Sequence, residues 1–507
     1  MNMVDQNQPA AVSEEAIVSP QSVFRAAVWL TGAKIVAYGI GFISTIVLAR
    51  ILVPADFGII ALAMAVVSVS SAVLELPVTL ALIQMDDPTD EDFNTAWTLS
   101  ILRAISISIF LLVIAHPVAR FFHMPHVGNV IMVLAIQPLI FGLRNSHFER
   151  YARDLKFSWD ITSELLAKSA QFMACVAIAL IWKSYWAFVA GVLISAIVGL
   201  VVTYVAYPQF PKFSLSSTRK LFGFSAWLGL GAMFNQLNAQ TSRFVVASAF
   251  GQTSLGQFDI GSRLSTEISQ FLLIPITRSL FSAFSRIVND AERFRAAYLR
   301  SQSTTSAIVM PVGIGLGLMA DLLIPLLLGD KWSPAILIVQ VYAPTMALTV
   351  MAAPIRSVGM ALNRTKDLMH RDIVSFLVRV TGMVGGAYFF GFAGFLAAYC
   401  LTAIVIVFIN LGFLSKFVDV SILQQLRNVS RSLISAACMA IIVMQAKHLV
   451  GPLHSPWLTG LEIGVLSALG AISYATCHCL LWHMNGRPDG PEEMGLRVAR
   501  SLSRRQA

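Results

Sequence analysis

Residues 27–48 read AVWLTGAKIVAYGIGFISTIVL, an apolar stretch with one charged side chain, Lys34. About 20 consecutive apolar residues are enough for a helix to cross the hydrocarbon core of a bilayer. A charge at that depth costs at least ~2.5 kcal/mol, so intramembrane charges usually face a protein-lined or wet interior and serve a function. The stretch therefore predicts a transmembrane helix whose lysine faces the inside of a helical bundle.

Similar stretches recur along the whole chain, which is 56% hydrophobic and only 12% charged. Soluble domains average roughly 25% charged residues, so this composition indicates a polytopic membrane protein without a soluble domain. We expect an all-α fold with about 14 transmembrane helices. They cover residues 27–48, 57–83, 93–115, 127–145, 159–181, 185–207, 222–250, 255–285, 302–328, 334–358, 372–390, 393–414, 428–446 and 457–481.

The order of these helices suggests two related halves. Phe57-Gly58 at the second helix recurs as Leu255-Gly256 at the eighth, and repeated halves around a midplane site are a common transporter plan. The expected organisation is a tail (1–26), a six-helix lobe (27–207), a linker (208–221), a second six-helix lobe (222–414), two additional helices (415–481) and a basic tail (482–507).

The basic residues of the connecting loops are strongly biased to one side. One set of loops is rich in arginine and lysine, as in Arg144, Arg150, Arg153 and Lys156. By the positive-inside rule, this set and both termini are cytoplasmic. We expect no cleaved signal peptide, because no basic segment leads into a short apolar run at the N-terminus. The opposite loops hold only Arg50, Arg120, Lys183, Lys331 and Lys447.

Charged residues inside the predicted helices indicate an interior that handles an anion. Positions three and four apart share a helix face, which predicts polar stripes through Lys34, through Glu164 and Lys168, and through Arg263 and Glu267. The acids Glu75, Glu164 and Glu267 are candidates for ion coupling. The basic residues expected at membrane depth are Lys34, Arg103, Lys168, Arg243, Arg263, Arg278 and Arg379.

Structural roles remain open for several of these charges. Glu164 with Lys168, and Arg263 with Glu267, have the spacing of intrahelical ion pairs. Arg103, Arg278 and Arg379 could extend to the membrane interface instead. Glu75 precedes Pro77, where a kink is the favoured interpretation.

Four segments resemble the polysaccharide transporter family, the Wzx-type flippases of the MOP superfamily. They are LARILVPADFG at 48–58, RKLFGFS at 219–225, the stretch 255–286 and LGDKWSPA at 328–335, and the resemblance covers residues 22–415. It implies a MOP/MATE-like fold and transport of lipid-linked oligosaccharide across the bacterial inner membrane. Arg263 matches the arginine that related lipid flippases direct into a cationic cavity, and Arg286 matches the basic end of that helix. Asp259 departs from the usual pattern.

The resemblance and the interior charges together predict a secondary-type flippase rather than an enzyme. Its substrate would be an oligosaccharide on undecaprenyl pyrophosphate, used for lipopolysaccharide or exopolysaccharide, and Lys34, Arg103, Arg243, Arg263 and Arg278 would bind its charge. Expected partners are this lipid, membrane lipids and the polysaccharide polymerase and chain-length machinery, without nucleic acid. No metal site, cofactor, disulfide or ATP-binding loop is expected. The alternatives are a MATE-type multidrug or ion antiporter and a membrane-embedded polymerase or glycosyltransferase.

Overall fold

The computed structural model describes residues 20–74, 82, 85, 88–153, 158–218, 226–450, 455–486 and 492. Every regular element within these ranges is a helix, so the prediction of an all-α fold is confirmed. The first half contains α1 (Pro20–Ile51), α2 (Pro54–Val73), α4 (Asp90–Phe121), α5 (Pro125–Leu134), α6 (Ile136–Gly142), the 3₁₀ helix η1 (Ser146–Phe148), α7 (Glu149–Arg153), α8 (Ser158–Trp182) and α9 (Trp186–Ala206).

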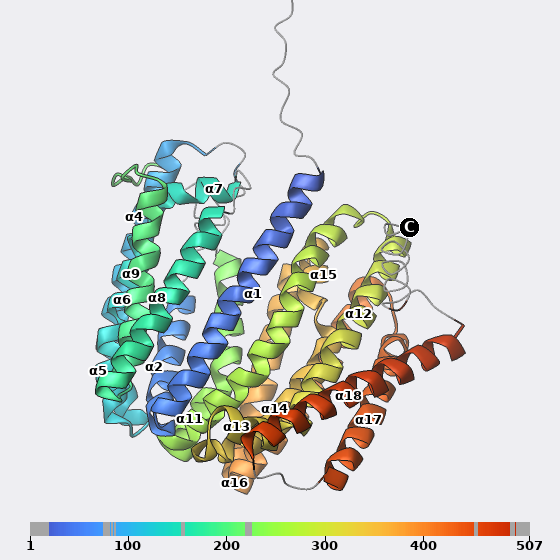
Figure 1. Ribbon diagram of the computed structural model, residues 1–507. Coiled ribbons are helices and arrows are strands. Elements are labelled where there is room, and N and C mark those ends of the chain that lie inside the picture. The colour runs from blue at the N-terminus through green and yellow to red at the C-terminus, as the bar shows by residue number, and fades with distance from the viewer. Residues whose placement is uncertain are drawn as a thin grey trace, which may run out of the picture.

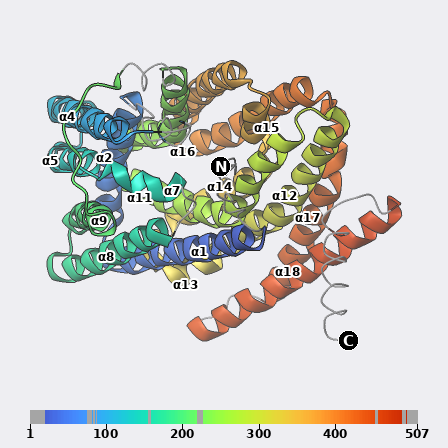
Figure 2. The same cartoon turned by 90° about the horizontal axis from the view of Figure 1, so that it is seen from above.

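The second half is also built from helices, several of them bent. It contains α11 (Ala226–Arg286), α12 (Ala291–Leu318), α13 (Ala320–Leu327), η2 (Asp330–Trp332), α14 (Pro334–Thr349), η3 (Val350–Ala352), α15 (Ile355–Ala361), α16 (Thr365–Val418), α17 (Ile422–Val450) and α18 (Pro456–Met484). In both views of the molecule, α4, α5, α8 and α9 lie on one side and α12, α15, α17 and α18 on the other (Figures 1 and 2).

Two long elements each join two of the predicted helices. Gly251 (φ 77°, ψ −174°) interrupts α11, and Gly391 (φ 63°, ψ −150°) interrupts α16. Glycine adopts positive φ at little cost, which allows the chain to break at these positions. Arg243 bonds Asp259 across the first break, although an unbroken helix would hold them about 24 Å apart. The two parts of α11 therefore fold back on each other as a helical hairpin.

The helices of the described residues have the length and composition of membrane spans. Ten of them pass this test, or eleven if α12 and α13, bent by 72°, form one span. The element α16 is counted once there, and α11 is not among them because its sequence carries many polar residues. The chain is a multi-pass membrane protein, and its helices follow the predicted order once α11 and α16 are divided at their glycines.

Some predicted helix boundaries were wrong. The helix α12 begins at Ala291 instead of residue 302, because Asp290 caps it by accepting a hydrogen bond from the backbone N–H of Arg293 at 3.1 Å. Hydropathy marks only the apolar part of a helix and misses polar turns that continue beyond it. The kink predicted at Glu75 and Pro77 lies outside the described residues.

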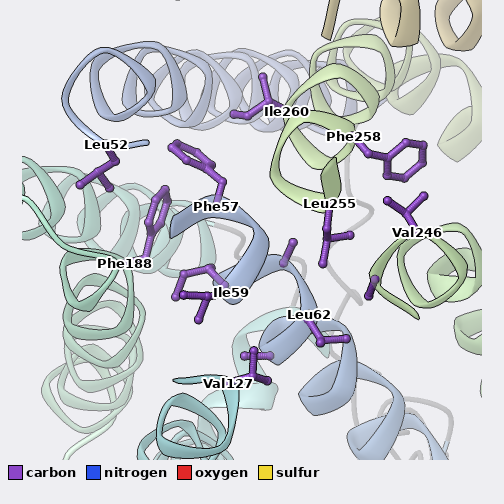
Figure 3. Packing of buried hydrophobic residues seen from close by; sticks show 14 of the residues in the cluster. Leu52, Phe57, Ile59, Leu62, Val127, Phe188, Val246, Leu255, Phe258 and Ile260 are labelled. Atoms are coloured by element: carbon purple, nitrogen blue, oxygen red, sulfur yellow. The ribbon is translucent and has the colours of Figure 1, made fainter. Parts of the chain in front are cut away.

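The core joins both halves around the start of α2. Phe57 packs edge-on against Phe188 and Trp332, with ring centroids 5.0 and 5.2 Å away, and Figure 3 shows Phe57 and Leu255 in the same cluster. A Cβ at Gly58 would lie 1.8 Å from the carbonyl oxygen of Gln252, and one at Gly256 would lie 1.8 Å from that of Pro54. Each glycine thus admits the backbone of the other helix.

Two of the segments that carry the family resemblance meet in space, although they are far apart in sequence. The ammonium of Lys331 donates to the carbonyl oxygens of Arg50 at 2.9 Å and Leu52 at 2.8 Å. The buried indole of Trp332 donates to the carbonyl of Ala49 at 2.9 Å, and Arg50 in turn donates to the carbonyl of Leu327 at 2.8 Å. These bonds fasten the end of α1 to the connection between α13 and α14.

Candidate functional site

Two arginines of the α11 hairpin share one buried carboxylate. The Asp259 side chain is 2% exposed and lies between the hairpin's two parts. Arg243 donates from Nε to Asp259 Oδ1 at 2.8 Å, and Arg263 donates from Nη2 to Oδ2 at 3.3 Å. Arg243 also donates to Gln240 Oε1 at 2.6 Å. Since a guanidinium has five N–H donors, both arginines keep donors beyond these bonds.

The break at Gly251 explains why these side chains meet. Arg243 and Asp259 each lie eight positions from Gly251, on opposite arms of the hairpin, and Asp259 lies one turn before Arg263. A carboxylate this deeply buried needs compensating donors, and two guanidiniums provide them. Asp259 is therefore what holds the two arginines together.

Lys34 and Glu164 form an ion pair between α1 and α8. The Nζ of Lys34 lies 2.7 Å from Glu164 Oε2, with the side chains 24% and 39% exposed. The sequence offered Lys34 no acid one turn away, and its partner comes from another helix instead. Of the roles left open for Glu164, the described contacts show an ion pair with Lys34 of another helix instead of Lys168 of its own.

Glu267 lies near both groups of charges without a hydrogen bond of its own. Its Oε2 atom is buried and has no hydrogen-bond partner among the described residues. The positive charges of Arg263 and Lys168 both act on this carboxyl, and Lys168 belongs to α8. For Arg263, whose pairing with Glu267 was left open, the described hydrogen bond goes to Asp259, one turn before Arg263 instead of one turn after.

Arg103 is placed apart from the α11 hairpin. It lines a cavity of about 310 Å³ together with Ser68, Ser71 and Gln137, between α2, α4 and α6. Among the residues described as lining this cavity none belongs to α11, so Arg243 and Arg263 are not part of its wall. Its role in substrate binding stays a prediction.

Three further predicted residues give less information. Glu75 and the side chain of Arg278 lie outside the described residues. Arg379, on α16, has a buried Nε atom without a hydrogen-bond partner among the described residues. Its charge acts on the fully buried Tyr399, which stacks on Tyr342 with ring centroids 4.2 Å apart.

Acids offset most of the positive charge of this region. The positive charges described near the Asp259 carboxylate and along α8 are those of Lys34, Lys168, Arg243 and Arg263. The acids described there are Asp160, Glu164, Asp259 and Glu267, so the two signs nearly balance. What distinguishes the site is the orientation of two guanidiniums, not a large net charge.

Comparison with known proteins identifies the family. The family described as "Polysaccharide biosynthesis protein" matches residues 47–337, more than half of the chain. Lipopolysaccharide biosynthesis protein WzxC of Escherichia coli K12 is 23% identical over 381 residues, which are 74% of this chain and 77% of that protein. Succinoglycan biosynthesis transport protein ExoT of Rhizobium meliloti is 25% identical over 321 residues, 63% and 65% of the two chains.

Solved structures show the same fold. The lipid II flippase MurJ, in an inward closed conformation, has a TM-score of 0.73 at 14% identity, over 91% of this chain and 100% of that one. An inward-facing multidrug resistance MATE family transporter of the MOP superfamily has a TM-score of 0.59 at 10% identity, over 76% and 94%. The chain thus shares its fold with these transporters and belongs to the family described as "Polysaccharide biosynthesis protein".

Proposed function

We propose that this protein moves oligosaccharide units linked to undecaprenyl pyrophosphate across the bacterial inner membrane, for the synthesis of lipopolysaccharide or exopolysaccharide. Both termini would lie in the cytoplasm. The family match and the names of the relatives support transport in polysaccharide synthesis. The structural observation that supports a lipid pyrophosphate is the pair of arginines around Asp259.

A pyrophosphate cannot enter hydrocarbon unless fixed donors replace its hydration. Arginine suits this task, because its planar fork can bind two phosphate oxygens at once. Arg263 is partly exposed and bonds among the described residues to Asp259 alone, through one nitrogen. Its other N–H groups would bind the headgroup, while Asp259 keeps the guanidinium in position. Arg243 is held by two hydrogen bonds, to Asp259 and Gln240, and would act mainly by positioning Asp259.

Energy would come from an ion gradient or the membrane potential. Glu267 is the proposed coupling residue, because its carboxyl lies between charges of α8 and α11. Protonation or cation binding there would change the charge that Arg263 meets, and so couple the ion to the headgroup. Glu75 and Glu164 are weaker proposals, since Glu164 is committed to Lys34. The two lobes predicted from the sequence would expose the site first to one side and then to the other.

A deletion strain tests the transport step. Loss of the gene should leave lipid-linked glycan on the cytoplasmic leaflet and remove the surface or secreted polysaccharide. Complementation with the intact gene is the control. Normal polysaccharide export by the deletion strain, in a background without a second transporter of this family, would contradict the proposal. Changed sensitivity to cationic drugs with normal polysaccharide would instead support a MATE-type antiporter.

A further inference from the structure

A second cavity lies at the C-terminal helices, away from the α11 hairpin. It measures about 710 Å³ and is lined by residues of α12, α13, α14, α17 and α18. Most of its wall is apolar, with Ile314, Leu322 and Val443 among its residues, and it lies beside the 72° bend between α12 and α13. The volume falls within the range of roughly 300–1,000 Å³ that small-molecule sites occupy.

One buried acid in this wall has no partner. Glu462 of α18 is 6% exposed, and its Oε2 atom makes no hydrogen bond within the described part of the chain. An ionisable group at membrane depth is costly, and a buried carboxylate needs a donor or a positive charge. Glu462 is a lone acid in an apolar helix and belongs to none of the polar stripes predicted from the sequence. The cavity that it lines is where a donor would enter.

A positively charged group lies in the same wall. The Nζ of Lys447 donates to the carbonyl of Leu318 at 3.1 Å and to the carboxylate of Asp321. An ammonium has three N–H donors, so one remains beyond these two bonds. His448 follows Lys447 and also lines the cavity. The wall thus offers an acceptor at Glu462 and a donor at Lys447 and His448.

The occupant is better matched by an amphiphile than by an ion. No group of three or more histidine, cysteine or acidic side chains that could hold a metal occurs among the searched, described residues. On α18, Leu461 just before Glu462 and Val465 one turn after it are exposed, as lipid-facing residues are in a membrane span. An amphiphile from the bilayer would place its apolar part against the apolar wall of the cavity.

We propose that this cavity binds the headgroup of a zwitterionic phospholipid with a primary amine, as in phosphatidylethanolamine. The ammonium of the lipid donates to Glu462, and its phosphate accepts from Lys447 and His448. The site is separate from the one that would bind the transported glycan, so the proposal stands independently of the transport function. The lipid would hold α18 against α12 and α13.

The test titrates the purified protein with dioleoyl phosphatidylethanolamine, its N-methyl and N,N-dimethyl forms, and phosphatidylcholine, with bound lipid counted by native mass spectrometry. Each methyl group removes one N–H donor, so binding should weaken stepwise along this series. Glu462→Gln keeps the size of the side chain and removes the unpaired charge, so it should fold. It should bind phosphatidylethanolamine about tenfold more weakly, the scale of one charge-assisted hydrogen bond, and lose the stepwise preference.

Glu292→Gln is the matched control, because Glu292 is exposed at the start of α12 and does not line the cavity. It should bind all four lipids as the wild type does. Equal binding of the four lipids to the wild type would overturn the proposal. So would an unchanged preference in Glu462→Gln, or a stronger preference for polyprenyl phosphate that Glu462→Gln leaves intact.

Discussion

The ammonium of Lys34 on α1 lies 2.7 Å from the carboxylate of Glu164 on α8. The pair connects α1 to α8. One turn further along α8 lies Lys168, whose positive charge acts on the carboxyl of Glu267 in α11. A lysine that the sequence assigned to substrate binding is therefore also part of the packing of the first half. The two roles give different results on mutation.

If Lys34 acts mainly through this pair, Lys34→Met should lower stability and export because it leaves Glu164 unpaired. The double variant Lys34→Met with Glu164→Gln should then recover both. Both side chains are partly exposed, so the pair contributes about 1 kcal/mol or less. Thermal unfolding of the purified variants, together with polysaccharide export, measures both effects. A double variant that is stable but still fails to export would show that Lys34 also contacts the substrate.

Arg263→Ala should reduce export about tenfold or more while the protein still folds, because Asp259 keeps its bonds to Arg243. Arg263→Lys should recover only part of the export, since a point charge replaces a fork. Asp259→Asn should instead lower stability, because it leaves two guanidiniums side by side without compensation. The amount of polysaccharide exported, divided by the amount of folded protein in the membrane, distinguishes a loss of transport from a loss of stability.

Arg293→Ala is the control for that series, since its side chain is 79% exposed and pairs only locally with Asp290. It should export normally. Full export by Arg263→Ala at matched expression would remove Arg263 from the proposed site.

Ala substitutions at Gly58 and Gly256 should each lower the yield of folded protein, because a Cβ there would meet the backbone of the other helix at 1.8 Å. Overpacking typically costs about 1–3 kcal/mol, and rigid backbone neighbours place these sites at the upper end. Gly39→Ala is the matched control, since a Cβ at Gly39 meets nothing within 4 Å. Equal melting temperatures for the three variants would contradict the close packing of α2 against α11.

His147 predicts a dependence of stability on pH. Its imidazole is fully buried in η1 and stacks between the rings of Phe93 and Tyr207. Burial lowers the pKa of this ring below 6.5. The positive charge of Arg150 lowers it further, while the negative charge of Asp90 opposes the shift. The folded protein then binds fewer protons than the unfolded chain, so stability falls as the pH drops below 6.5 and levels off below the folded pKa. Replacing the ring with His147→Phe should flatten this part of the melting-temperature profile. A parallel profile in the variant would assign the pH dependence elsewhere.

The sequence predicted the helices better than the contacts between their side chains. Length and hydropathy define each span locally, and glycines such as Gly251 and Gly391 mark the breaks. The partner of Lys34 lies 130 positions away, so no local spacing could reveal it. Arg263 had an acid one turn away in both directions, and only the hairpin, which brings Arg243 to the same place, selects Asp259. Glu462 was missed because its surroundings come from helices distant in sequence.

The close approach of α2 and α11 also bears on how the two halves can move. Where Gly58 and Gly256 meet the opposite helix, the nearest atoms are backbone, so no large side chains interlock at that point. The distance between the two helices at that point is therefore set by peptide groups, which have no rotamers to change. A motion between the two halves that keeps the fold intact has to preserve this spacing.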